Sequence, residues 1–148
     1  MISVIIQKVS KLHNLPTKQQ FTTWVTTALA KSQRQGELLI RIVDMKEMAE
    51  LNRQYRKKSG PTNVLSFPFK SSLFAPDNSL GDIVLCAPVI KAEAKTQQKK
   101  ILSHWAHLTI HGTLHLLGFD HMTPKDATPM EQLEIEYLGR LGFNDPYN

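Results

Sequence analysis

One segment of the chain reads His111-Gly112-Thr113-Leu114-His115-Leu116-Leu117-Gly118-Phe119-Asp120-His121, with histidines at offsets 0, 4 and 10 and a glycine at offset 7. Residues four apart lie on one face of a helix, so His111 and His115 are expected to point at the same ion. Gly118 can adopt the positive φ that ends a helix and lets the chain turn back toward His121. Three imidazoles and a water form an open zinc site of the catalytic kind. The segment therefore predicts one Zn²⁺ per chain, bound by His111, His115 and His121.

The histidine spacing matches the metzincin zinc motif H-E-x-x-H-x-x-G-x-x-H, but Gly112 stands where the proteases have glutamate. That glutamate is the general base that activates the metal-bound water. A glycine inside a helix costs about 1 kcal/mol relative to alanine, so its presence indicates that substrate or a neighbouring strand approaches the helix closely. The motif predicts a hydrolase whose base does not occupy the peptidase position.

Composition predicts a single globular domain over residues 1–148. The chain is 41% hydrophobic and 21% charged, which is ordinary for a globular protein. Its one cysteine, Cys86, lies in an apolar run and is expected to be a buried thiol. No segment approaches the roughly 20 apolar residues needed to span a bilayer, and the N-terminus lacks the features of a signal peptide. We therefore expect a cytoplasmic protein with no membrane partner.

The charge is +5, from 18 basic and 13 acidic residues. A basic balance favours a polyanionic partner such as nucleic acid, although lysines on a helix also form ordinary solvated faces. Two clusters carry much of the excess: Arg53, Arg56, Lys57 and Lys58, and then Lys91, Lys95, Lys99 and Lys100.

Hydrophobic periodicity predicts an α/β (α+β) fold with a small mixed four-stranded sheet, packed helices and a central zinc-bearing helix. Thr17 with Gln20 forms a capping box, and Asp44 with Glu47 is a second capping signature. The long loop 68–79 carries aromatic residues and is either a substrate flap or a disordered segment. Strands are expected near 2–6, 37–43, 62–67 and 82–87, and helices near 17–35, 44–55, 89–98, 101–117 and 130–141.

Several segments together resemble the bacterial YbeY family of rRNA maturation factors, which are single-strand-specific metallo-endoribonucleases. The histidine segment 111–121 is the most specific, and Leu141-Gly142-Phe143 with its preceding helix also fits. Two positions depart from the family pattern, because many members have an acidic residue near Ser59 and an aspartate in place of Asn63. The remaining matching segments are Leu51-Asn52-x-x-Tyr55-Arg56, Thr62-Asn63-Val64-Leu65-Ser66-Phe67-Pro68 and Leu80-Gly81-Asp82-Ile83.

The resemblance implies cleavage of single-stranded RNA, maturation of the 3′ end of 16S rRNA on the small ribosomal subunit, and ribosome quality control. It also implies zinc binding by His111, His115 and His121 and a functional role for Arg56. Zinc and a planar arginine together suit the charge of a phosphodiester transition state. A surface salt bridge is the alternative role for Arg56.

Asp120 is the carboxylate nearest to the third histidine in sequence. It is a candidate to orient a ligand imidazole or assist proton transfer, and the alternative is a turn residue that caps backbone amides. His104 and His107 lie on the same helical stripe as His111 and His115. They either line a groove that contacts RNA or serve packing.

Two other functions remain open from the residues alone. One is a metallopeptidase with its base elsewhere, which Gly112 disfavours. The other is a non-catalytic ribosome assembly factor stabilised by zinc. It needs a fourth ligand such as Asp120, because structural zinc has a closed shell. The choice between a water and the RNA 2′-OH as nucleophile is likewise open.

Overall fold

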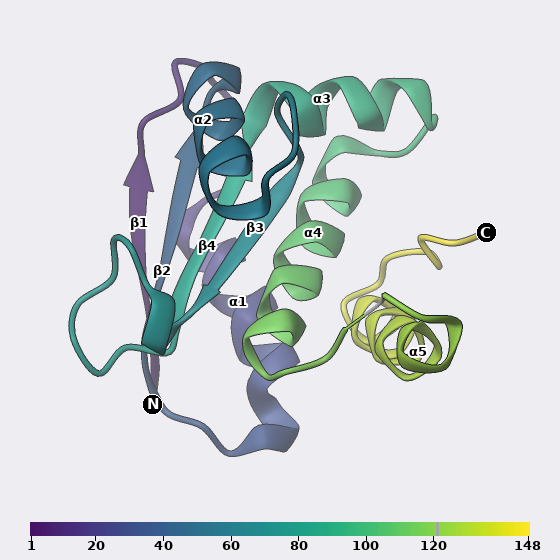
Figure 1. Cartoon of the computed structure of the whole chain (residues 1–148). Helices are drawn as coiled ribbons and strands as arrows, with labels where there is room; N and C mark the ends of the chain where they lie inside the picture. The colour runs from purple at the N-terminus through teal and green to yellow at the C-terminus, as the bar shows by residue number, and fades with distance from the viewer. Residues whose placement is uncertain (121) are drawn as a thin grey trace.

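The computed structural model describes residues 1–120 and 122–148, and in these residues strands and helices alternate along most of the chain (Figure 1). The strands are β1 (Ile2–Lys8), β2 (Gly36–Val43), β3 (Val64–Pro68) and β4 (Gly81–Cys86). The helices are α1 (Lys18–Leu29), α2 (Met45–Arg56), α3 (Ala87–Thr96), α4 (Ile101–Leu116) and α5 (Pro124–Arg140).

The four described strands form one mixed sheet in the order β1-β2-β4-β3. Strand β2 is parallel to both β1 and β4, and β3 pairs antiparallel with β4 at the edge of the sheet. Every residue of β4 is buried, as expected for a strand covered on both faces. The predicted mixed four-stranded sheet with packed helices is confirmed.

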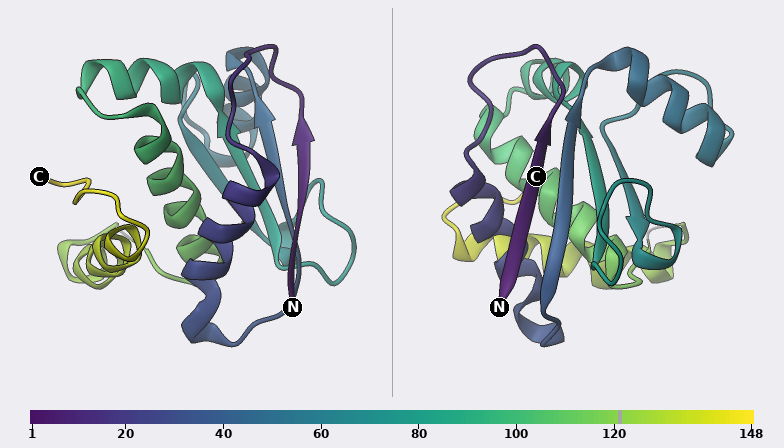
Figure 2. Two further views of the ribbon diagram at one scale, coloured as in Figure 1. Left: turned by 180° about the vertical axis from the view of Figure 1, so that it is seen from behind. Right: turned by 90° about the vertical axis from the view of Figure 1, so that its left-hand side faces the viewer.

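The helices cover the two faces of the sheet unequally. Figure 2 shows the sheet nearly edge-on, with α1 and α4 on one side and α2 on the other. The larger core lies on the α1/α4 side and includes Phe21 and Trp105, whose rings meet edge to face. A smaller core under α2 contains Met48 and Phe67. Helix α4 is central as predicted, because it packs on β3 and β4 with one side and on α5 with another.

Gly112 is the point where α4 contacts the sheet most closely. A Cβ built on Gly112 would lie 2.9 Å from Ile83 Cγ2, 3.1 Å from Ser66 Oγ and 3.3 Å from Val64 Cγ2. Ser66 Oγ also donates a hydrogen bond to the carbonyl of Gly112 at 3.0 Å. The sequence predicted that substrate or a neighbouring strand lies close to the helix at Gly112, and strands β3 and β4 take this place.

The side-chain cap predicted from the sequence is present at the start of α1 and absent at the start of α2. Thr17 and Gln20 form the predicted capping box. Asp44 occupies the N-cap position of α2, but its side chain makes no cap bond and instead accepts from Ser10 Oγ and Lys11 N. The helix therefore begins where the sequence predicted, but without the side-chain cap, because Ser10 and Lys11 bind the Asp44 carboxylate and the hydrogen bond from Ser10 lowers its pKa.

The closing helix α5 begins at Pro124, six residues before the expected start at Met130. Pro129 lies inside this helix, although a proline has no amide for the i→i−4 bond. It is tolerated near the first turns of the helix, where Thr128 Oγ1 donates to the carbonyl of Pro124 at 3.0 Å. Within the described residues, no helix is long and apolar enough to cross a membrane.

Asp82 fixes the loop between β3 and β4. Its carboxylate has no exposed area and accepts bonds from the amides of Leu73, Phe74 and Ala75 and from Ser72 Oγ, at 2.6–2.9 Å. The loop is thus built around the buried carboxyl group of Asp82.

Candidate metal-binding groove

Four histidines lie along α4, at positions 104, 107, 111 and 115. His104 and His107 are buried, whereas His111 and His115 are partly exposed at the C-terminal half of the helix. The rings of His111 and His115 meet edge to face with centroids 4.6 Å apart. The helix therefore brings the first two predicted metal ligands together.

His111 and His115 present their Nε2 atoms to each other at 3.1 Å. His111 Nδ1 lies 2.7 Å from Glu134 Oε2, and His115 Nδ1 lies 2.9 Å from the carbonyl oxygen of Phe119. Both of these oxygens are acceptors, so each Nδ1 donates to its partner and the two Nε2 atoms face each other. Two nitrogens bound tetrahedrally to zinc at about 2.0–2.1 Å lie roughly 3.3 Å apart. The pair thus has a spacing and an orientation that would suit a metal ion such as zinc.

The turn at the C-terminal end of α4 fixes the orientation of the His115 ring. Gly118 has φ +98° and donates from its amide to the carbonyl of His115 at 3.0 Å. The Phe119 amide donates to the carbonyl of Leu114 at 3.1 Å, which completes a Schellman turn. The turn brings the Phe119 carbonyl back over His115 Nδ1. Gly118 therefore reverses the chain as predicted and also orients a ligand.

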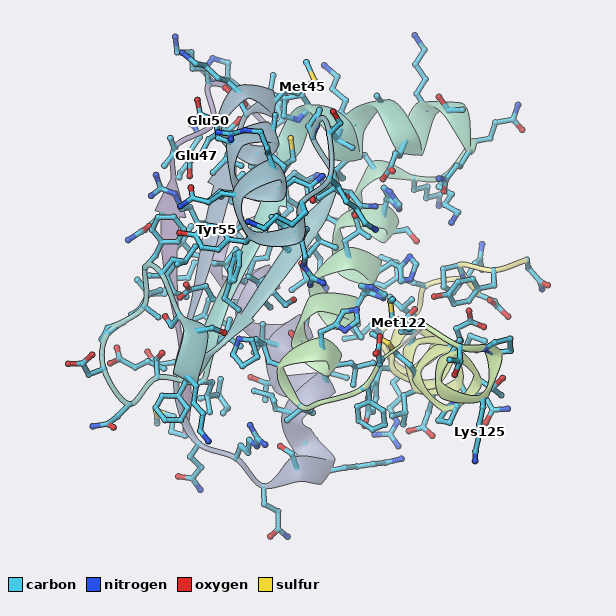
Figure 3. All side chains as sticks on the ribbon, viewed as in Figure 1. Met45, Glu47, Glu50, Tyr55, Met122 and Lys125 are labelled. Atoms are coloured by element: carbon cyan, nitrogen blue, oxygen red, sulfur yellow. The ribbon has the colours of Figure 1, made fainter. Side chains whose placement is uncertain are left out.

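His121, the third predicted ligand, lies outside the described residues, so its ligation stays a prediction. Asp120 is exposed, and its Oδ1 accepts from the amide of Met122 at 3.2 Å. That bond is the turn contact considered as an alternative for Asp120. Met122, labelled in Figure 3, lies between the end of α4 and α5.

A groove of about 560 Å³ opens beside the two histidines. Arg56 and Lys58 line it from the end of α2 and the following loop, and Asp120 lines it from beyond α4. The structure thus places Arg56 and Asp120 in the same groove as His111 and His115. Loop residues 69–80 do not line it, so the proposed substrate flap lies elsewhere.

Arg56 ends α2 and is exposed to solvent. Across residues 1–120 and 122–148 its guanidinium forms no ion pair, so the surface salt bridge considered for it is not formed there. Lys57 ends the helix with φ 58°, and buried Asn52 donates to the carbonyl of Gly60 at 2.9 Å. The ring of Tyr55 (labelled in Figure 3) packs edge-on against Phe67 of β3, with centroids 5.5 Å apart. These contacts hold the end of α2 against the groove.

Glu134 of α5 is the site residue that sequence reasoning missed. It has no exposed area, and its Oε1 lies 2.8 Å from His107 Nε2 and accepts from the Tyr147 hydroxyl. Burial alone would raise the pKa of Glu134, but hydrogen bonds from His107 and His111 lower it to about 2. A signal existed, because Met130, Glu134 and Leu138 share one helical face and the acidic residue stands in an otherwise apolar stripe.

His107, His111 and Glu134 offer ligand atoms within 4.8 Å of one another, so this group could also hold a metal ion. In the observed arrangement, however, the carboxylate is bonded directly to both rings. His111 Nδ1 is thereby engaged by an acceptor, while its Nε2 faces His115. We therefore favour the His111–His115 pair as the core of a metal site, with Glu134 behind it.

His104 and His107 do not line the groove. His104 is 3% exposed and bonds to Glu93 Oε1 at 2.9 Å, and burial lowers its pKa against the opposing effect of Glu93. Asn63 Nδ2 donates to the same carboxylate at 3.0 Å. His104 is thus paired with Glu93 and His107 with Glu134, and neither histidine lines the groove.

The chain is similar to a known protein family and to a solved structure. A family model described as "Endoribonuclease YbeY" matches residues 5–142. Among solved structures, the solution structure of TM1509 from Thermotoga maritima is similar, with a TM-score of 0.63 and 22% sequence identity. The match covers 100% of this chain and 99% of that one. At this identity, the structural likeness shows a shared fold alone.

Proposed function

Since the chain belongs to the endoribonuclease YbeY family, whose members act on RNA in rRNA processing, we propose that it is a zinc-dependent, single-strand-specific endoribonuclease. Its role would be maturation of the 3′ end of 16S rRNA on the small ribosomal subunit and ribosome quality control in the cytoplasm. The observation that carries the proposal is the pair of Nε2 atoms of His111 and His115, 3.1 Å apart beside a groove lined by Arg56.

Three histidines would hold one zinc ion: His111 and His115 from α4, and His121 by its sequence spacing. When bound, zinc supplies a Lewis acid and a water acidic enough to be partly hydroxide at neutral pH. The hydrogen bonds to Glu134 and to the Phe119 carbonyl keep both described imidazoles in the tautomer that binds metal.

Arg56 would bind the scissile phosphate. Its planar guanidinium can donate two parallel hydrogen bonds to non-bridging oxygens, where charge accumulates as the reaction proceeds. Asp120 is the carboxylate among the described residues that line the groove, and we assign it proton transfer with the reacting groups. Lys58 adds positive charge along the same groove.

The packing at Gly112 supports a nuclease over a peptidase. A Cβ at this position would point at Ile83 and Val64 of the sheet, so a glutamate there would first have to displace packed side chains. This packing disfavours a peptidase base at position 112, so a metallopeptidase would need its base elsewhere.

The test uses the purified protein with a labelled single-stranded RNA, the same sequence as a duplex, and a peptide pool, each with and without a chelator. We expect cleavage of the single strand alone, lost with chelator and restored by added zinc. Cleavage that persists in metal-depleted protein would overturn the zinc dependence, and peptide cleavage would overturn the reaction class. The product ends identify the nucleophile, since a 2′,3′-cyclic phosphate requires attack by the 2′-OH.

A further inference from the structure

A fully buried carboxylate links α5 to the candidate metal site. Glu134 has no exposed area, although burying an unpaired carboxylate costs several kcal/mol. Three donors compensate it: His111, His107 and the hydroxyl of Tyr147. The carboxylate therefore has a defined position before any ligand binds.

The two carboxylate oxygens of Glu134 accept hydrogen bonds from different donors. Oε2 accepts from His111 Nδ1 at 2.7 Å, whereas Oε1 is shared by His107 Nε2 at 2.8 Å and the Tyr147 hydroxyl. Because His107 and Tyr147 hold Oε1 from one side, the carboxylate cannot rotate away from His111 without breaking two further bonds. The C-terminal segment that carries Tyr147 thus supports the orientation of His111. The same segment is tied to the α3–α4 turn, where Lys99 Nζ donates to the carbonyl of Pro146 at 2.7 Å.

The two described imidazoles consequently differ in electronic character. His111 donates to a carboxylate, and His115 donates to a neutral backbone carbonyl. A charged acceptor at Nδ1 makes the opposite nitrogen a stronger electron donor and fixes the ring more firmly.

We propose that Glu134 is a positioning residue that sets the metal affinity of the groove through His111, with Tyr147 and His107 holding its carboxylate. This inference rests on the metal site of the proposed function. It gives α5 and the C-terminal segment control over how tightly the site binds zinc.

The experiment compares Glu134→Gln with the matched variant Glu93→Gln. Glu93 is likewise a carboxylate bonded to a buried histidine of α4, His104, but that histidine lies outside the groove. Zinc affinity is measured by competition with a chromophoric chelator. We expect the dissociation constant to rise 10–100-fold in Glu134→Gln, the range typical for loss of such a partner, and less than threefold in Glu93→Gln. Tyr147→Phe should give a smaller rise in the same direction.

A second readout does not involve metal. Nitrogen-15 NMR of the histidine rings in metal-depleted protein reports which nitrogen carries the proton. His111 should be protonated at Nδ1 in the wild type and should become a mixture of tautomers in Glu134→Gln, with His115 unchanged. Equal affinity losses in the two glutamine variants, or an unchanged affinity and tautomer in Glu134→Gln, would overturn the inference.

Failure of this inference is distinguishable from failure of the proposed function. If the wild type binds zinc and His115→Ala abolishes binding while Glu134→Gln does not weaken it, only the role of Glu134 is wrong. If the wild type binds no zinc, the metal site itself is wrong, and with it this inference.

Discussion

Gly112 and Ile83 touch so closely that a Cβ on the glycine would lie 2.9 Å from the Ile83 methyl Cγ2. Ile83 is completely buried, so it has no space into which to move. Gly112→Ala should therefore destabilise the protein by about 1–3 kcal/mol, as overpacking of a core does, despite the better helix propensity of alanine. The free energy of unfolding, from urea titration of the metal-depleted protein, measures this effect.

Gly139 provides the control, because it also lies in a helix and nothing stands within 4 Å of a Cβ built there. Gly139→Ala should stabilise the protein by about 0.5–1 kcal/mol. Equal stabilisation by both alanines would show that Gly112 is not required by the contact between α4 and β4.

Zinc binding should depend on His115 and not on His104, a buried histidine of the same helix that does not line the groove. His115→Ala removes one of the two facing Nε2 atoms and should lower the zinc content of the chelator-equilibrated protein at least tenfold. His104→Ala, a change to a buried histidine outside the groove, should leave the zinc content unchanged. Elemental analysis of folded protein, with circular dichroism as the check on folding, makes the comparison. Full occupancy in His115→Ala would remove it from the ligand set.

Local rules were enough to predict the histidine pair. The spacing of four residues puts His111 and His115 on one helical face, and Gly118 ends the helix where a positive φ is needed. The strands and the central helix could also be predicted, because each pattern of apolar residues lies within a single element.

Contacts between distant elements could not be predicted this way. Glu134 reaches His111 because α5 packs against α4, and α5 starts six residues before the position expected from the sequence. Arg56 lines the groove at the end of α2, where Tyr55 packs against Phe67 of β3, and the sequence did not predict this tertiary contact. Asp44 satisfied the local pattern of an N-cap, but Ser10 and Lys11 bind its carboxylate from another part of the chain.

Asp82 should contribute to the stability of the fold and not to the function of the groove. Asp82→Asn replaces an acceptor oxygen with an NH₂ group that faces backbone amides, so buried donors lose their partner. We expect a loss of about 2–3 kcal/mol. Asp77→Asn, an exposed change in the same loop, should lie within about 0.5 kcal/mol of the wild type. Urea unfolding of both variants tests this, and equal stabilities would contradict the role of the carboxylate as the loop's internal anchor.

His104 should make stability depend on pH. Burial lowers its pKa below the ordinary value of 6.5, so the unfolded chain binds a proton more readily than the folded chain. Its contribution is therefore present above pH 6.5 and is lost as the pH falls below that value toward the folded pKa. Between pH 7.5 and 5.5 the melting temperature of metal-depleted His104→Gln should fall less steeply than that of the wild type. His13→Gln, an exposed histidine far from α4 in sequence, should retain the wild-type slope. A parallel slope in His104→Gln would show that other groups cause the pH dependence.

Arg56 should act on the chemical step of RNA cleavage. Arg56→Ala should keep zinc and fold but lose cleavage at saturating RNA by roughly 10²–10³, as when one preorganised donor is removed. Arg56→Lys should rescue only partly, since an ammonium cannot make the bidentate contact.

The matched control for Arg56 is Arg53→Ala, which removes the same charge from the same helix, at an exposed position that does not line the groove. If positive charge on α2 serves only to attract RNA, both variants should weaken RNA affinity equally, increasingly so at higher salt, and neither should change the rate at saturation. If Arg56 binds the scissile phosphate, its loss alone slows the single-turnover rate at saturating RNA. We expect that difference, because Arg56 lines the same groove as His111 and His115 whereas Arg53 does not.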